Sequence, residues 1–503
     1  MPNIFQNKLY FFYLSMFGFL FSLYAFNTFS MDDFHLHTEM GKWIVSHREI
    51  PYIAVGSWYG EETNLPWIAH EWLSEVLFYL NFSFCGNNVT VVQVICFFLC
   101  FSFMCLIIHL NKKEMEKHYL SSFVYLSILS LSFYGFFVYR PQIFSFFLFF
   151  SEIYCLTRFR ENHNKNFLIP IPFIAILWAN FHGGSSALSY VIPILFVVFN
   201  YIPVNKIGLS HKFYLNKLSL QEVQFLLLSS VGAFLGLFIN PYGYRMVTYP
   251  YENMMDENML SYILEWVPLN ITLPEHIYLI FPVLFFAWFS LFQSKSKIDI
   301  VDFMFLLTFT FMTFKSGRFV MYFSIYSSFC IWKYFNCAEA PVLESQKKRV
   351  SHNIKLTVLL FMCLSLAVFY KGSVGSFFTH DDTVSRHQAI ISKIVAENPK
   401  HIWNRVFHDE LLVSGVKPFV DGRADAFTGE PFLVATRYID HSFLDPEKMI
   451  EKYKFDYVLL LQSDPLMIFI RHNPEKFQLI YEESSSDFET PYKKEAMSFY
   501  RLR

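Results

Sequence analysis

Long apolar runs decide what this chain can fold into. Eleven of them follow one another, at residues 9–29, 88–110, 119–138, 141–157, 167–181, 185–203, 222–239, 275–292, 299–314, 318–335 and 354–370. Each is near the length that an α-helix needs to cross about 30 Å of hydrocarbon. Only 16% of the residues are charged, against roughly a quarter in soluble proteins. The sequence therefore predicts a polytopic α-helical membrane protein with about 11 transmembrane helices, the first of them a retained anchor.

The loops between these runs alternate in charge. Lys and Arg concentrate in one set, which includes residues 111–117, 206–217 and 347–349, and are sparse in the other set. Basic loops stay on the cytoplasmic side of a membrane. We therefore expect a multi-pass protein of the plasma (inner) membrane with a cytoplasmic N-terminus, and the odd number of spans leaves the C-terminus extracytoplasmic.

Residues 371–503 differ in character from the apolar region before them. Charges return and apolar segments shorten to strand length. The patterns predict an amphipathic helix over Val384–Glu397 and strands over 405–408, 418–420, 457–461, 477–481 and 498–502. We predict a transmembrane domain over residues 1–370, with a long first outer loop over 30–87, and an extracytoplasmic α/β domain over 371–503.

Composition excludes two kinds of site. Most of the 8 cysteines lie inside apolar runs, and none has metal-ligand spacing, so neither a disulfide framework nor a cysteine metal site is expected. Basic patches interleaved with aromatic residues are also missing, which argues against a nucleic-acid partner.

Unusual polar residues gather in the loops predicted to face outward. They are Asp32, Asp33, His35, His37, His70 and Glu71 in the first outer loop, Arg140, His182, Asn240, Tyr242, Arg245, Glu265 and Arg318 at the other outer ends, and Asp421 and Arg423 in the C-terminal region. Ionisable residues at membrane depth are costly and usually line spaces filled by water or substrate. This one-sided distribution predicts a substrate cavity at the outer leaflet.

The residue types suit a substrate with a phosphate and a hydrophobic tail. Asp32 or Asp33 can act as a general base or hold a divalent cation, Mg²⁺ or Mn²⁺. Guanidinium groups clamp phosphate well, which suits Arg140, Arg245 and Arg318. The histidines add proton-transfer or metal-binding capacity.

Structural alternatives stand beside these roles. The two aspartates can simply end a helix, and the arginines can reach the lipid headgroups as anchors. The segments 240–243 and 421–423 are also typical turn sequences.

The ordered motifs resemble the GT-C glycosyltransferase superfamily, which includes protein mannosyltransferases and lipid A aminoarabinose transferases. The matching segments are Asp33–Gly41 (Asp-x-x-x-His-x-x-x-Gly), His70–Leu73, Arg140–Gln142, Trp178–Gly183, Asn240–Gly243 and Asp421–Arg423. The resemblance implies transfer from a polyprenyl-phosphate-linked sugar at the outer face of the membrane. It assigns the catalytic base or metal ligand to Asp33, with Asp32 as the alternative, and the family histidine to His37, whereas His35 departs from the pattern.

We therefore expect an inverting glycosyltransferase that acts on an envelope glycan, lipid or protein. Two other classes remain as alternatives: a transporter or lipid flippase, and a non-catalytic envelope-assembly protein. A transporter usually has repeat-related halves and polar groups near the middle of the membrane, and neither is visible in the sequence.

Overall fold

The chain folds into two compact units. The computed structural model describes residues 8–26, 33–206, 208, 210–255, 268–270, 272, 276–334, 387–405, 408–427, 429–431, 434, 445–483 and 496–503. Unit 1 consists of the described parts of Met1–Ser30 and Asn87–His380, and unit 2 of those of Met31–Gly86 and Asp381–Arg503.

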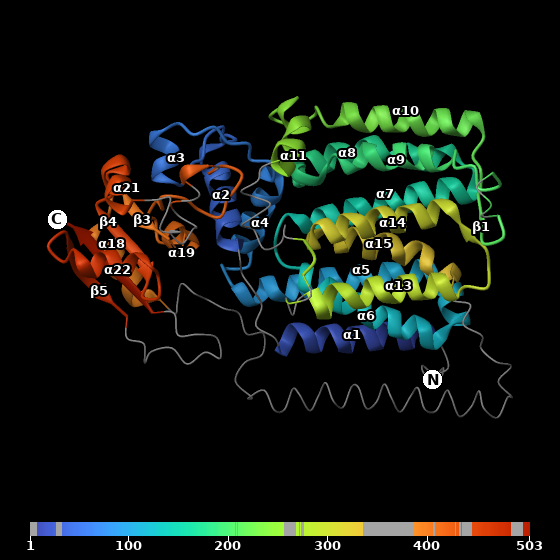
Figure 1. Ribbon diagram of the computed structural model, residues 1–503, viewed down its shortest axis with the longest axis horizontal. Helices are drawn as coiled ribbons and strands as arrows, with labels where there is room; N and C mark the ends of the chain where they lie inside the picture. Colours follow the sequence, from blue (N-terminus) through green and yellow to red (C-terminus); the bar gives the residue numbers. More distant parts are fainter. Residues whose placement is uncertain are drawn as a thin grey trace. The chain divides into compact units, whose positions relative to one another are not determined.

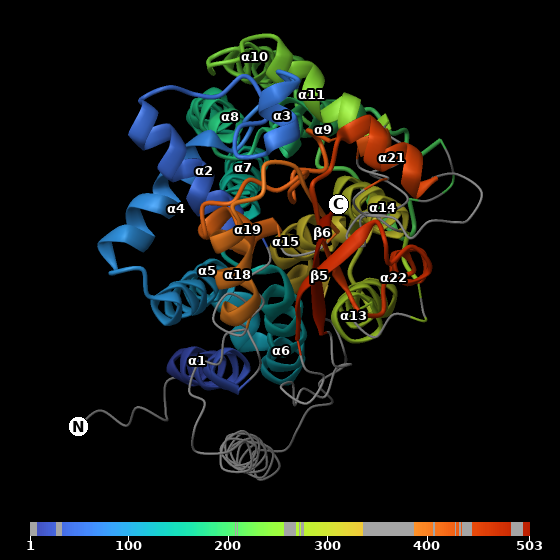
Figure 2. The ribbon, with the colours of Figure 1, turned by 90° about the vertical axis from the view of Figure 1, so that its left-hand side faces the viewer.

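Unit 1 is a bundle of helices whose axes run side by side (Figure 1) and are seen nearly end-on in Figure 2. The helices are α1 (Lys8–Phe26), α5 (Val89–Lys117), α6 (Tyr119–Phe136), α7 (Gln142–Asn162), α8 (Pro170–Phe181), α9 (Leu188–Phe199), α10 (Leu220–Gly236), α11 (Arg245–Met255), α13 (Phe281–Gln293), α14 (Ile300–Lys315) and α15 (Val320–Cys330). Short helical turns, among them η2 (Lys165–Leu168), η3 (Gly183–Ser185), η5 (Gly317–Phe319) and η6 (Ile331–Tyr334), connect or extend them. At one end, β1 (Phe213–Tyr214) pairs in parallel with β2 (Ile298–Asp299).

The predicted helical class is confirmed. Each apolar run between residues 9 and 335 forms a helix, and the run at 354–370 lies outside the described residues. Within the described residues, the segment Thr90–Met115 of α5 is the helix that is long and apolar enough to cross a membrane. The other apolar helices are shorter, so 11 membrane crossings stay a prediction.

Aromatic rings fill much of the interior of unit 1. Phe103 lies at the centre of one cluster, with ring centroids 5.3 Å from Phe133 and 4.9 Å from Phe150. Such edge and tilted ring contacts stabilise the fold in addition to the contribution from buried apolar area. Other large apolar side chains point outward: Phe285 and Phe311 are each 70% exposed.

Unit 2 combines the first-loop helices with the C-terminal elements (blue and orange to red in Figure 1). The former are α2 (Phe34–His47), α3 (Trp58–Glu62) and α4 (Trp72–Phe84), and the latter include α18 (Gln388–Glu397), α19 (His408–Val413), α21 (Pro446–Tyr453) and α22 (Leu466–His472). A four-stranded sheet has the order β3 (Ile402–Asn404), β4 (Tyr457–Leu461), β6 (Met497–Leu502), β5 (Phe477–Glu482). The β3–β4 pair is parallel and the other pairs are antiparallel.

The strands predicted at 457–461, 477–481 and 498–502 are confirmed, and two others are wrong. Of the segment predicted at 405–408, residues 406 and 407 lie outside the described residues; the strand lies just before it, at Ile402–Asn404, and His408 already begins α19. Residues 418–420 form no strand because the Asn404 side chain takes the place of a neighbouring strand. Its Oδ1 accepts from Phe419 N at 2.7 Å and its Nδ2 donates to Val420 O at 3.3 Å.

First-loop residues complete the core of unit 2. The Trp58 indole donates to Ile402 O at 3.1 Å, and its ring packs near Phe419 and Phe455. Ser57 Oγ donates to Phe419 O at 2.6 Å. The loop thus folds with the C-terminal residues, whereas the sequence-based division grouped it with the transmembrane helices.

Candidate functional site

The segment from Asp33 to Gly41 forms the first part of the candidate site in unit 2. Asp33 precedes α2 with a left-handed backbone (φ 60°), and its carbonyl accepts the first helical bond, from His37 N at 3.0 Å. Aspartate tolerates this conformation better than most residues. One and two turns further on, His37 and Gly41 lie on the buried face of α2.

Gly41 lets α2 and α4 approach closely. A Cβ atom at this position would lie 2.0 Å from the carbonyl oxygen of Glu75, so only glycine fits. Because His37 is one helical turn before Gly41, its ring faces the start of α4. The Asp-x-x-x-His-x-x-x-Gly spacing therefore presents His37 to α4 at this crossing.

His37 meets two glutamates there. Its Nδ1 is 3.5 Å from Glu75 Oε1 and 3.7 Å from Glu71 Oε2. Burial lowers the pKa of His37, but its contact with Glu75 and the charges of Glu71, Glu75 and Asp33 raise it above the ordinary value. Burial raises the pKa of Glu75, and His37 opposes that shift.

His70 and Asp425 continue the cluster beyond Glu71. His70 Nε2 lies 3.4 Å from Glu71 Oε1, and Asp425 Oδ2 lies 3.8 Å from His70 Nδ1 and accepts from Trp67 Nε1 at 3.1 Å. Burial lowers the pKa of His70, but the nearby carboxylates, Glu71 foremost, outweigh it and raise the pKa to about 9. These carboxylates therefore favour the protonated form of His70.

The Asp421–Gly422–Arg423 turn closes the cluster. Arg423 Nε donates to Asp421 Oδ1 at 2.8 Å, its Nη2 donates to Val55 O at 2.6 Å, and its guanidinium lies 4.4 Å from the Trp67 ring centroid. A Cβ atom on Gly422 would lie 2.7 Å from Asp33 Oδ1, so the Asp33 carboxylate rests against this turn. Two motifs almost 400 residues apart in the sequence thus meet.

Asp409 is a member of this cluster that the sequence analysis missed. Its Oδ2 accepts from Leu36 N at 3.4 Å, and its Oδ1 is buried without a hydrogen-bond partner among the described residues. Burial, then the charges of Asp33, Glu410 and Asp421, raise its pKa well above the ordinary range, which the Leu36 N–H only partly offsets. A carboxyl that keeps its proton beside a second carboxylate is a common acid–base arrangement.

Asp409 should make unit 2 less stable as the pH rises. Below about pH 4 the carboxyl is protonated in both the folded and the unfolded chain. Above that pH the unfolded chain releases the proton while the folded chain still holds it. The free energy of unfolding then falls by about 1.4 kcal/mol per pH unit, until the pH reaches the pKa of Asp409 in the folded protein. The side chain of the Asp409→Asn variant cannot ionise. The difference between its melting temperature and that of the wild type should therefore increase in favour of the variant from pH 5 to pH 8. A pH-independent difference would contradict this prediction.

The other predicted site residues, apart from His35 in unit 2, lie in unit 1 or outside the described residues. Arg318 Nη2 is 3.5 Å from Gln142 Oε1, which joins the Lys-Ser-Gly-Arg end to the Arg-Pro-Gln motif. His182 is buried, and its Nδ1 contacts Ser145 Oγ at 2.6 Å and Ser185 Oγ at 3.0 Å. Asp32 and Glu265 lie outside the described residues.

The remaining predicted residues lie in local turns, at helix starts or in ring packing. Asn240 Oδ1 accepts from Tyr242 N at 2.7 Å, as in a helix-ending turn, and Tyr242 is buried. Arg245 is exposed at the start of α11, and Arg140 lies partly exposed just before α7. His35 packs its ring 5.1 Å from that of Phe34.

Three further acids escaped the sequence analysis: Glu75 and Glu152, which are buried, and Asp425, which is partly buried. Glu75 carries a detectable signal, because it follows Glu71 by four residues and so shares its helical face. Asp425 follows Arg423 in what reads as an ordinary turn. Glu152, in the middle of α7, is fully buried, and neither of its carboxylate oxygens has a hydrogen-bond partner among the described residues. Glu152 was missed because it is a single acidic residue within the apolar run 141–157.

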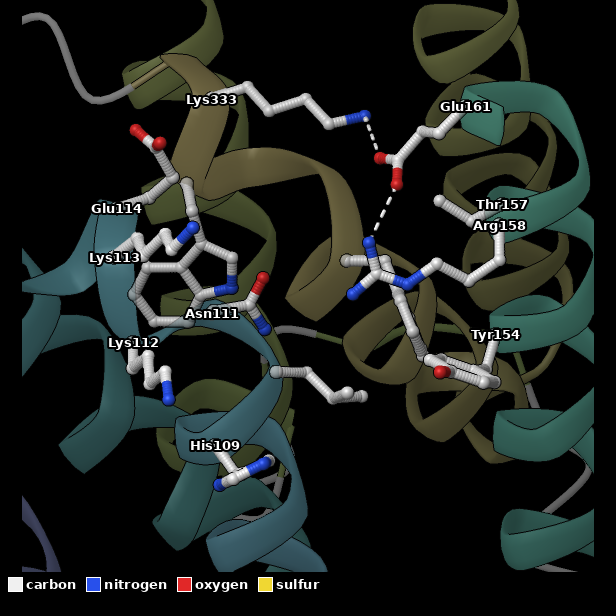
Figure 3. A pocket seen from close by; sticks show the side chains of 13 residues that line it. His109, Asn111, Lys112, Lys113, Glu114, Tyr154, Thr157, Arg158, Glu161 and Lys333 are labelled. Atoms are coloured by element: carbon white, nitrogen blue, oxygen red, sulfur yellow. Dashed lines mark hydrogen bonds and ion pairs between the residues drawn. The ribbon is translucent and has the colours of Figure 1, made fainter. Parts of the chain in front are cut away.

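One pocket of unit 1 lies at the end that carries the basic loops. It encloses about 610 Å³ between α5, α7 and η6 and has several Lys and Arg side chains at its wall. Figure 3 shows Glu161 between Arg158 and Lys333, at 2.8 Å and 3.8 Å respectively. The sequence analysis expected no site at this end.

The comparisons with known proteins assign no family. No protein-family model matches the chain, and the search of curated proteins found no match.

Proposed function

We propose that this chain is a membrane glycosyltransferase that moves a sugar from a polyprenyl-phosphate donor to an envelope glycan, lipid or protein at the outer face of the plasma membrane. The observation that carries the proposal is the packing of the Asp33 carboxylate against Gly422, in the cluster that holds His37 and Asp409. Motifs that resemble the GT-C superfamily from both ends of the chain contribute to this one cluster.

A membrane location is supported by the outer surface of the unit 1 helices. Phe173, Leu228 and Phe311, on three different helices, are 63%, 68% and 70% exposed. Large apolar side chains at such exposure are costly in water and favourable against lipid. The alternation of basic and non-basic loops supports the proposed orientation.

The proposed reaction is a direct displacement with inversion. Asp33 accepts the proton of an acceptor hydroxyl, and the acceptor oxygen attacks the anomeric carbon of the donor sugar. The bond from that carbon to the phosphate oxygen breaks, and the electron pair leaves with the polyprenyl phosphate. Burial and the charge of Asp33 raise the pKa of Asp409 and favour its protonated form, so Asp33 is the carboxylate left to take up the proton.

Charge on the leaving phosphate needs a cation. Arg140, Arg245 and Arg318 are predicted from the sequence as phosphate ligands, since guanidinium groups stabilise developing negative charge well; they lie in unit 1, and their role stays a prediction. A divalent cation, Mg²⁺ or Mn²⁺, at Asp33 is not required by this scheme.

A gene deletion in the source organism tests the proposal. Polyprenyl-linked sugars and envelope glycans are compared by mass spectrometry between the deletion strain and the same strain carrying the wild-type gene. We expect the deletion to lose one glycan and to accumulate its lipid-linked donor. A lost glycan without accumulation of its lipid-linked donor, or unchanged glycans and donors, would overturn the proposal.

A further inference from the structure

We propose that His37, Glu71 and Glu75 bind a divalent metal ion in unit 2, and that the ion is zinc. The three side chains offer one nitrogen and two carboxylate oxygens, and these ligand atoms all lie within 4.8 Å of one another. His37 comes from α2, and the glutamates come from the residue before α4 and from its first turn. This ligand set differs from Asp32 and Asp33, where the sequence analysis placed a cation.

The two distances from His37 to the glutamates are close to those of a tetrahedral zinc site. Two ligand atoms at the usual 2.0–2.2 Å from zinc lie about 3.3–3.6 Å apart in a tetrahedral site. His37 Nδ1 is 3.5 Å from Glu75 Oε1 and 3.7 Å from Glu71 Oε2. Neighbouring ligands of octahedral Mg²⁺ lie only ~3 Å apart, and Mg²⁺ prefers oxygen ligands alone. A histidine with two carboxylates therefore suits zinc better.

Among the described residues, hydrogen bonds leave the Glu75 carboxylate incompletely satisfied. Glu75 is 2% exposed, and its Oε2 has no hydrogen-bond partner among the described residues. The 3.5 Å contact with His37 is long for a hydrogen bond. The charge of Arg423 lowers the pKa of Glu75, but the guanidinium donates its hydrogen bonds to Asp421 and to Val55 O. A buried carboxylate so poorly matched is costly, and a bound cation removes that cost.

The surroundings resemble those of a functional metal site. Gly41 holds the two helices close enough for the ligands to meet. The Glu71 oxygen that does not face His37 lies 3.4 Å from His70 Nε2, an outer contact of the kind that orients metal ligands. The Glu71 side chain is 16% exposed, so the cluster is not sealed from solvent, and zinc sites commonly take water as a fourth ligand.

Metal analysis of the full-length protein tests the proposal. The wild type and the Glu75→Gln and Glu71→Gln variants are purified in detergent without metal-affinity resin, dialysed against ZnCl₂ and then against metal-free buffer, and analysed by mass spectrometry for zinc. The matched control is Glu39→Gln, on the exposed face of α2 where Glu39 pairs with Lys42.

We expect about one zinc per chain in the wild type and in Glu39→Gln, and at least a tenfold loss in both ligand variants. A chelator should lower the melting temperature of the wild type but not that of Glu75→Gln. Zinc retained in both ligand variants, or absent from the dialysed wild type, would overturn the proposal. Because neither measurement involves sugar transfer, this inference stands or falls separately from the proposed function.

Discussion

An Asp33→Asn variant is expected to insert and fold like the wild type. Its rate of sugar transfer should fall by about 100- to 10 000-fold, which is the usual contribution of a positioned general base to the rate. Asparagine has nearly the same shape, tolerates the left-handed backbone at this position and still fits against Gly422. It cannot accept the proton of the acceptor hydroxyl. The measurement is the restoration of the missing glycan in the deletion strain.

The matched control for this experiment is Glu39→Gln. It removes one carboxylate from the same helix, α2, but from an exposed pair with Lys42, and such pairs contribute little to stability. Glu39→Gln should restore the glycan fully. If Asp33→Asn restores it equally well at matched protein levels, Asp33 is not the base, and a non-catalytic role in envelope assembly becomes the better explanation.

Helices were the most predictable part of the fold. Apolar runs of 15 or more residues leave the backbone few alternatives to a helix, so their positions follow from composition alone. Their ends were less predictable: α7 continues to Asn162, beyond the run predicted to end at residue 157, because Arg158 and Arg160 are good helix formers.

Long-range contacts in unit 2 could not be predicted. The sequence marks both Asp33 and the 421–423 turn as unusual, but no local pattern says that Gly422 lies on the Asp33 carboxylate. Asp409 resembles any acidic residue in the first turn of a helix, and only its burial beside Asp33 distinguishes it. The strand predicted at 418–420 failed for a similar reason, since a distant side chain, Asn404, satisfies that backbone.

A Gly41→Ala substitution should destabilise unit 2 strongly. The new Cβ would lie 2.0 Å from the Glu75 carbonyl oxygen, 2.5 Å from its carbonyl carbon and 2.9 Å from Tyr79 Cβ. These neighbours are backbone or near-backbone atoms that no rotamer change can move, so α2 and α4 must separate. Overpacking of this kind costs about 1–3 kcal/mol or more, against a gain of at most ~1 kcal/mol in helix propensity.

Gly18→Ala provides the comparison, because nothing lies within 4 Å of a Cβ atom at Gly18 in α1. That variant should match or slightly exceed the wild type in stability. Protease resistance of unit 2 across a temperature series measures the effect, and Gly41→Ala should shift cleavage within residues 33–86 to lower temperature. Separation of the helices also moves His37 away from Glu71 and Glu75, so the same variant should lose the contacts that define the cluster. Equal protease resistance in the two variants would show that α2 and α4 do not cross at Gly41.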